Sequence, residues 1–260
     1  MKRWCVIGAL ALAQTLAGCA SSDGQVDSGL WHHNAGLSNQ AIPRLLSGVP
    51  ALERSNPANP RLPTAYVALG DLASADRHFD AADGFYKKAL QAARTYHPAN
   101  AMLNRNARVH GGNFLRAQGR NAEAIPLLTE AVAISEGDAS MPRVLYAIDL
   151  DNLSVAYGFL PDDAQAQQLS QRALGVLDGI EQTNAVKATR GVVLYNAAYR
   201  LAEKGQDAQA EIYYGQSLAA VSAYGEKWRA TVVRDAYAKL LRKMGREAEA
   251  AALKGPGAKP

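Results

Sequence analysis

Apolar and small residues recur at helical spacing along most of this chain, and residues 150–174 show the pattern most clearly. Leu153 and Tyr157 are four positions apart, so they would share one face of a helix. A turn at residues 160–163 separates them from a second apolar stretch that ends at Leu174. The pattern predicts two short amphipathic helices joined by a turn. Such a hairpin cannot bury both of its faces without neighbours of the same kind.

Three small residues mark this hairpin, one in its first helix and two in its second. The same register recurs about every 42 residues, at Gly70, Ala82 and Ala89; Gly112, Ala124 and Ala131; Ser154, Ala166 and Ala173; and Ala198, Ala210 and Ser217. A turn position recurs with it at Gly119, Pro161, Gly205 and Gly245. Small residues let helices approach closely, while large ones fill the space between layers. Self-similarity at a fixed period indicates an all-α solenoid.

This register predicts helices near residues 64–76, 79–96, 101–118, 121–136, 142–159, 163–179, 184–204 and 207–224. Residues 30–54 resemble a degenerate first repeat with a shortened first helix. The Pro-rich residues 55–63 are predicted to form a rigid loop before the first good repeat. Residues 227–253 keep Gly245 and Ala250 in register and have a charged outer face, which is typical of a capping unit.

The small and large positions together resemble the tetratricopeptide repeat, and Tyr66–Gly70 with Ala82, Tyr86 and Ala89 is the best copy. The period exceeds the usual ~34 residues and looks like the longer variant of kinesin light chains, to which Asp151-Asn152-Leu153 is also similar. HEAT or armadillo repeats fit the period too, but the small residues favour the tetratricopeptide interpretation. The resemblance implies a right-handed superhelical solenoid of antiparallel helix pairs. We expect about four clear repeats between two degenerate caps, within a repeat domain at residues 30–254.

The amino terminus has the pattern of an export signal. Lys2 and Arg3 precede an apolar stretch at residues 4–16, which is too short to span a bilayer as a stable helix. Residues 16–19, Leu-Ala-Gly-Cys, resemble a bacterial lipobox. The resemblance implies that residues 1–18 are a signal peptide and that Cys19 carries diacylglycerol and palmitate-type acyl chains. The alternatives are an ordinary signal peptide cut after Ala20 and a plain membrane anchor.

Residues 19–29 are predicted to form a flexible polar tether, and residues 255–260 a disordered tail. The residues after Cys19 lack the Asp associated with inner-membrane retention, so we expect the periplasmic face of the outer membrane. The only other cysteine, Cys5, lies in the signal peptide, so the mature chain would have no disulfide. Removal of Lys2 and Arg3 would lower the formal net charge from +4 to +2, too small to indicate nucleic-acid binding.

No catalytic or metal-binding motif is recognised in the sequence. HExxH, GxSxG, Walker and CxxC patterns are all missing. His32 and His33 would point about 100° apart on a helix, and no third metal ligand is evident. The remaining candidates are read as helix-surface or N-cap acids and as scattered histidines: Asp149, Asp151, Asp162, Asp163, His78, His97 and His110. We therefore expect no catalytic residue, no metal and no cofactor.

A binding surface remains as the functional hypothesis. In the repeat class that this chain resembles, the first helices line a concave groove. Carried over position by position, the partner-binding residues are Asn113, Arg116, Asp151, Asn152, Tyr195, Asn196, Tyr199, Lys239 and Arg242, flanked by Asn106, Val109, His110, Val155 and Asp235. An Asn amide can donate to and accept from a peptide backbone, Tyr offers apolar area with a polar tip, and Arg or Lys binds acidic groups. The alternative is that these polar groups only solvate an exposed face.

We therefore expect a non-enzymatic protein–protein interaction scaffold, anchored by lipid at the periplasmic face of the outer membrane. Its partners would be proteins or peptide segments in the groove, with no nucleic acid involved. An assembly factor of the pilotin type, serving a pilus, secretion or outer-membrane machine, is the first alternative. A cell-wall enzyme and a small-ligand binder are lesser alternatives. Binding on the convex side and homodimerisation through an end repeat also stay open.

Overall fold

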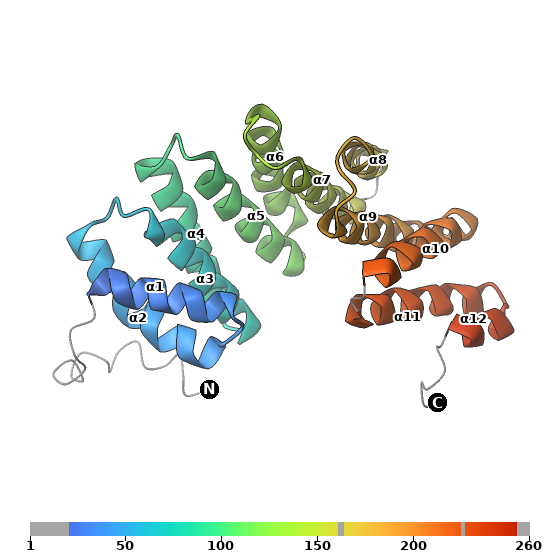
Figure 1. The fold of residues 1–260 in the computed structure, drawn as a ribbon, viewed down its shortest axis with the longest axis horizontal. Coiled ribbons are helices and arrows are strands. Elements are labelled where there is room, and N and C mark those ends of the chain that lie inside the picture. The colour runs from blue at the N-terminus through green and yellow to red at the C-terminus, as the bar shows by residue number, and fades with distance from the viewer. Residues whose placement is uncertain (1–20, 161–163, 225–226, 254–260) are drawn as a thin grey trace. The chain divides into compact units, whose positions relative to one another are not determined.

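The computed structural model describes residues 21–160, 164–224 and 227–253, which form twelve helices and no strand (Figure 1). They are α1 (Ser22–Asn34), α2 (Ser38–Ser55), α3 (Arg61–Ala75), α4 (Phe79–Tyr96), α5 (Ala101–Ala117), α6 (Asn121–Gly137), α7 (Arg143–Gly158), α8 (Ala164–Asp178), α9 (Asn184–Glu203), α10 (Asp207–Tyr224), α11 (Lys227–Lys243) and α12 (Glu247–Leu253). The predicted all-α class is confirmed, and the predicted bounds of α4 and α10 match residue for residue. The chain divides into two compact units, unit 1 up to Ile134 and unit 2 from Ser135.

Unit 1 is built from antiparallel helix pairs, with α1 against α2 and α3 against α4. The first helices of the pairs also contact one another, α1 with α3 and α3 with α5. We call α1, α3 and α5 the first-helix layer of unit 1. Its core is aliphatic, and Leu45, Leu52, Leu62 and Leu69 are at most 1% exposed.

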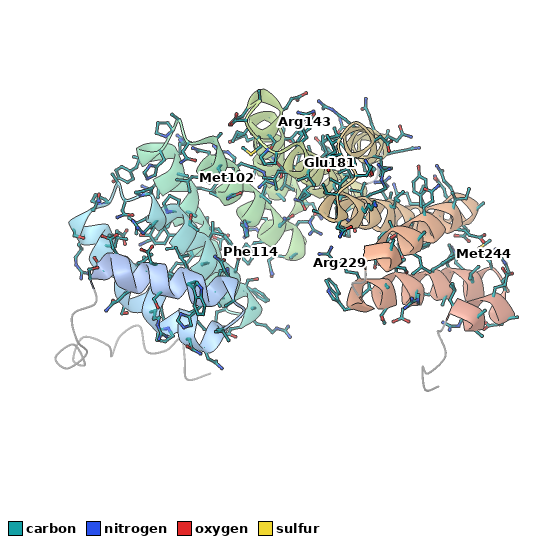
Figure 2. All side chains as sticks on the ribbon, viewed as in Figure 1. Met102, Phe114, Arg143, Glu181, Arg229 and Met244 are labelled. Carbon is teal, nitrogen blue, oxygen red and sulfur yellow. The ribbon has the colours of Figure 1, made fainter. Side chains whose placement is uncertain are left out.

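Two glycines explain how closely the helices of unit 1 approach. A Cβ atom on Gly70 would lie 2.7 Å from the Tyr86 ring, and one on Gly112 would lie 2.8 Å from Leu128. Phe114, labelled in Figure 2, then brings its ring to 5.0 Å from that of Tyr86. The small-residue positions predicted from the repeat are therefore sites of helix contact, as expected.

Unit 2 repeats the arrangement, with α7 paired to α8, α9 to α10 and α11 to α12. Its first-helix layer consists of α7, α9 and α11, because α9 contacts both of the others. Here two of the small positions are serines. The Ser154 hydroxyl donates to the Ala166 carbonyl at 2.7 Å, and the Ser217 hydroxyl donates to the Gly191 carbonyl at 2.7 Å. Both serines are buried, so these bonds satisfy hydroxyls that would otherwise be costly in the core.

The predicted turn positions adopt a left-handed backbone wherever the structure describes them. Gly119, Gly205 and Gly245 have φ between 74° and 77°, which glycine reaches without steric cost, and Gly36 between α1 and α2 has φ 72°. Arg77 takes the same role between α3 and α4 with φ 62°. The predicted turn at residues 161–163, the signal peptide with Cys19, and the tail at 255–260 lie outside the described residues.

The tether predicted for residues 19–29 is wrong from Ser22 onward, because this stretch forms the first turns of α1. Val26 and Gly29 are buried against α2, and a Cβ on Gly29 would lie 2.7 Å from Leu45. The first helix of the first repeat thus begins at Ser22 rather than near residue 30, and with 13 residues it is still shorter than α3 with 15 and α5 with 17. The polar composition of the segment concealed this, since its apolar contact depends on one valine and one glycine.

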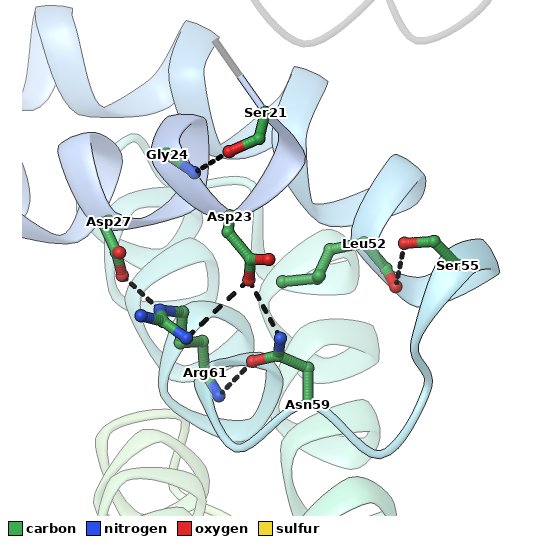
Figure 3. Close-up of polar contacts among 8 residues, drawn as sticks. All are labelled: Ser21, Asp23, Gly24, Asp27, Leu52, Ser55, Asn59 and Arg61. Atoms are coloured by element: carbon green, nitrogen blue, oxygen red, sulfur yellow. Dashed lines mark hydrogen bonds and ion pairs between the residues drawn. The ribbon is translucent and has the colours of Figure 1, made fainter.

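Polar contacts hold the same part of α1 to the start of α3 (Figure 3). Arg61 forms ion pairs with Asp27 and Asp23, and the Asn59 amide donates to Asp23 at 2.9 Å. The Asn59 side chain also accepts from the Arg61 backbone N–H at 3.0 Å, which satisfies the first N–H group of α3. The loop predicted for residues 55–63 therefore ends earlier than expected, at Pro60. None of the described helices is long and apolar enough to cross a membrane.

Candidate functional site

The first-helix layer of unit 1 contains a hollow of about 120 Å³. Residues of α1, α3 and α5 form its wall, so the hollow depends on the close packing of these three helices. We call it the α3 hollow. Its lining residues are Leu30, His33, Asn34, Pro63, Thr64, Val67, Ala68, Asp71, Leu103, Asn106, Ala107 and His110.

Asp71 is the centre of the polar side of the α3 hollow. The Tyr86 hydroxyl donates to its Oδ1 at 2.7 Å, and His110 Nδ1 lies 3.1 Å from the same oxygen. His33 Nε2 lies 3.6 Å from Oδ2. Three side chains from α1, α4 and α5 thus converge on one carboxylate of α3.

The pKa of the Asp71 carboxyl is set by two opposing effects. Burial disfavours the charged form, but the contacts from His110, His33 and Tyr86 outweigh it and hold the pKa well below its ordinary value. Asp71 is therefore ionised at neutral pH. Burial, together with the neighbouring Asp71 charge, raises the pKa of the Tyr86 hydroxyl, so Tyr86 remains a hydrogen-bond donor.

The repeat itself places this cluster. Asp71 directly follows Gly70, and the missing side chain at Gly70 lets the Tyr86 ring lie against α3. The Tyr86 hydroxyl then reaches the neighbouring carboxylate. Glycine and tyrosine are thus both part of the repeat pattern and part of the hollow's chemistry.

Asp71, His33 and His110 do not form a metal centre. Among the residues that the structure describes, no group of three or more His, Cys, Asp and Glu side chains is arranged to hold a metal ion. His33 is 24% exposed and His110 42% exposed, so both rings can meet a ligand at the surface of the hollow. Hydrogen bonding and charge are therefore the chemistry that this cluster offers.

The other predicted residues of unit 1 lie beside the hollow. Asn113 and Arg116 are half-buried on α5, one and two turns beyond His110, and neither lines the hollow. Asn106 and His110, which the resemblance places in the groove, do line it. The hollow therefore includes two positions that flank the predicted groove, and Asn113 and Arg116 lie outside it.

In unit 2 two predicted residues are bonded to each other. The Asn196 amide on α9 donates to the Asp151 carboxylate on α7 at 2.7 Å, and Asp151 is only 6% exposed. Asn152, next in the chain, is half-buried. Asp149 is 1% exposed and accepts from the Ser135 hydroxyl. The prediction that Asp149 and Asp151 are helix-surface or N-cap acids is wrong, because both lie inside α7 and are buried.

The remaining predicted residues of unit 2 are more accessible. Tyr199 is 45% exposed, and its ring lies 6.4 Å from that of half-buried Tyr195. Burial raises the pKa of Tyr195. Lys239 and Arg242 are exposed on α11, and Arg242 lies 3.7 Å from Glu247. These residues give unit 2 an aromatic pair and two basic side chains on its first-helix layer.

The cluster around Asp71 was missed because its members come from four helices. His33, Asp71, Tyr86 and His110 share no local spacing, and the repeat explains only Tyr86. One usable signal was the acid placed directly after the close-packing glycine. Knowing that α1, α3 and α5 are neighbours would then have pointed to the histidines on the same layer.

Comparison with solved structures identifies the same fold in other proteins. The structure is similar to that of PilW, described as a widely conserved type IV pilus biogenesis factor, with TM-score 0.65 and 16% identity over 92% of this chain and 95% of that one. It is similar to a putative kinesin light chain of Podosopora anserina with TPR-like repeats, with TM-score 0.54 and 17% identity over 79% and 97%. It is also similar to a Rap protein complexed with Competence and Sporulation Factor, with TM-score 0.61 and 11% identity over 92% and 74%.

A scan of protein-family models finds no match, and a search of the curated proteins finds none either. The likeness to solved structures therefore rests on shape rather than on sequence. It supports the predicted tetratricopeptide-like solenoid of antiparallel helix pairs.

Proposed function

We propose that this protein is a non-enzymatic adaptor that binds a segment of another protein on its first-helix layer. The observation that carries the proposal is the α3 hollow, a recess with a charged centre and apolar walls on that layer. Convergent polar groups in a partly apolar recess are typical of a binding site. The Rap protein, complexed with Competence and Sporulation Factor, has a similar fold.

Unit 2 offers a candidate surface of its own on its first-helix layer. Tyr199 presents exposed aromatic area, and tyrosine is enriched where partners bind because it combines apolar area with a hydroxyl. Lys239 and Arg242 are exposed and would take an acidic group of the partner. In unit 1, Asn113 and Arg116 would extend the contact beyond the hollow. Asp151 and Asn196 would serve this surface indirectly, by fixing α7 against α9.

The proposal includes a lipid anchor on Cys19 and a position at the periplasmic face of the outer membrane. The support is the lipobox-like sequence at residues 16–19 after a short apolar stretch. Several acyl chains anchor a protein stably, because each buried methylene contributes about 0.8 kcal/mol. A Cys19→Ser variant of the full chain, followed by membrane fractionation, tests the anchor. Recovery of this variant with the outer membrane at the wild-type level would show that lipidation of Cys19 does not cause the membrane association.

The adaptor function is tested by filling the α3 hollow. Thr64 is exposed and lines the hollow, so Thr64→Tyr adds bulk there without entering the core. Thr129→Tyr on α6 is the matched control, because Thr129 is exposed and lies outside the hollow. We expect crosslinking and pulldown from cell envelopes to recover a partner with wild type and Thr129→Tyr, but much less with Thr64→Tyr. Equal recovery with both variants would contradict binding at the hollow.

A second candidate function is assembly of an envelope machine such as a pilus. The observation that favours it is the likeness to PilW, a pilus biogenesis factor, which extends over 95% of that chain. In this role the adaptor would help a membrane component to insert or to form multimers. Deletion of the gene should then reduce the multimers of that component while its monomers persist. Unchanged multimers of every envelope machine in the deletion strain would rule out this role.

A further inference from the structure

The lining of the α3 hollow combines polar and apolar side chains. Asp71, His33 and His110 are polar, whereas the half-buried Leu30 and Leu103 give it apolar surface. A ligand that fits both kinds of side chain must combine an apolar stem with a polar end. Side chains of this kind are long and amphipathic, and they bury a stem while the polar end keeps hydrogen-bond partners.

The charge of the lining decides which polar end fits. Of the twelve described residues that line the hollow, Asp71 is the one acid, and none is Lys or Arg. Apart from the two histidines, the lining therefore carries one negative charge, that of Asp71. A cation would be attracted to it, and a carboxylate would be repelled.

The two oxygens of Asp71 differ in their contacts. Oδ1 accepts from Tyr86 at 2.7 Å and lies 3.1 Å from His110. Oδ2 lies within ion-pair distance of His33 Nε2, at 3.6 Å, and a carboxylate oxygen can accept from a further donor. The Asp71 side chain is 28% exposed, so an incoming donor can approach Oδ2.

The size of the hollow limits the ligand further. A cavity needs a volume of roughly 10–15 Å³ to hold one water molecule. The α3 hollow, at about 120 Å³, therefore accepts several non-hydrogen atoms. Drug-sized ligands occupy pockets of about 300–1,000 Å³. The hollow therefore suits one long side chain of a protein segment rather than a whole small molecule.

From these observations we infer that the α3 hollow binds a lysine or arginine side chain of the partner segment. The aliphatic stem lies along Leu30 and Leu103, and the cationic end donates to Asp71 Oδ2. This inference rests on the proposed adaptor function and names the chemistry that the partner must present.

The test uses the purified full chain and two capped peptides, acetyl-Ala-Ala-Lys-Ala-Ala-amide and its norleucine analogue. Norleucine keeps the aliphatic stem and removes the charge. The chain has only five histidines, so NMR signals of the His33 and His110 rings report directly on the hollow. We expect the lysine peptide to shift both signals at about pH 7.5 and to bind about tenfold more tightly than the norleucine peptide.

Two variants complete the test. Asp71→Asn should reduce affinity for the lysine peptide about tenfold, because it removes the charged acceptor. Asp80→Asn, which removes an exposed acid from α4 outside the hollow, should leave it unchanged. If circular dichroism shows that Asp71→Asn does not fold, Thr64→Tyr takes its place and should block both peptides.

Equal affinity for the two peptides at about pH 7.5, or wild-type affinity in folded Asp71→Asn, would overturn the inference. A peptide with glutamate in place of lysine that binds more tightly than the lysine peptide would also overturn the inference. These results leave the adaptor function intact if pulldown still recovers a partner that depends on Thr64. Conversely, lysine-selective binding to the purified chain would persist even if no partner were recovered from envelopes.

Discussion

Asn196 on α9 donates its side-chain amide to the Asp151 carboxylate on α7 at 2.7 Å. The repeat pattern assigns both residues to a ligand-binding groove, yet here they bind one another across two neighbouring repeats. Because Asp151 is 6% exposed, loss of this donor leaves a buried charge with weaker compensation.

We therefore predict that Asn196→Ala lowers the free energy of unfolding by about 1–3 kcal/mol. Asn152→Ala is the comparison, since Asn152 is half-buried and no hydrogen bond of its side chain is identified among the described residues. It should change stability by less than about 1 kcal/mol. Urea denaturation followed by circular dichroism measures both values. Similar losses in the two variants would mean that the bond to Asp151 contributes little.

Alanine substitutions at two glycines, Gly70 on α3 and Gly84 on α4, test how closely these helices approach. Gly70→Ala places a Cβ atom 2.7 Å from the Tyr86 ring and should destabilise unit 1 by about 1–3 kcal/mol through overpacking. Gly84→Ala on α4 meets nothing within 4 Å and should stabilise the helix by up to about 1 kcal/mol. Opposite signs in urea denaturation are the expected result. Stabilisation by Gly70→Ala would show that the helices are not in tight contact there.

The docking of α1 is tested by Val26, which is 0% exposed. Val26→Ala should lower the free energy of unfolding by about 1–3 kcal/mol, because it removes buried apolar volume. Trp31→Ala on the same helix should cost less than about 0.5 kcal/mol, since Trp31 is 63% exposed. If residues 22–29 formed a flexible tether, neither substitution would affect stability, and this outcome would contradict the helix.

The free energy of unfolding should depend on pH through the Asp71 carboxyl group. Its pKa is lower in the folded chain than the ordinary value of 3.8, so ionised Asp71 stabilises the folded state at pH values above 3.8. This contribution is lost as the pH falls below 3.8, because the unfolded chain takes up the proton first. Asp71→Asn should therefore lose less stability than wild type when the pH is lowered from neutral to about 3. Parallel acid profiles for the two proteins would contradict the assigned shift.

The order and spacing of the helices could be predicted from the sequence because each repeat carries its own markers. Gly70, Gly112 and Ser154 are where two backbones or a backbone and a side chain meet, and only small residues fit there. The markers disappear in α1, whose packing depends on Val26 and Gly29. A single valine in a polar stretch gives no periodicity, so the helix was predicted as a tether.

The candidate site was harder to predict because it depends on helix rotation. Asp151 and Asn152 are adjacent in sequence but point about 100° apart on a helix, and only one of them turns into the core. A resemblance to a repeat family assigns both to the same surface. The convergence of His33 and His110 on Asp71 needs the relative placement of three helices, which no local pattern contains.

The early start of α1 has a consequence for how the protein would search for its partner. Only two residues separate Cys19 from Ser22, where α1 begins, and an extended chain covers at most about 3.3–3.6 Å per residue. If Cys19 is acylated, at most about 10 Å of chain separates the lipid anchor from α1. The folded repeats would then stay at the membrane surface. Encounter then becomes a two-dimensional process along the membrane, which favours partners that also lie close to the bilayer.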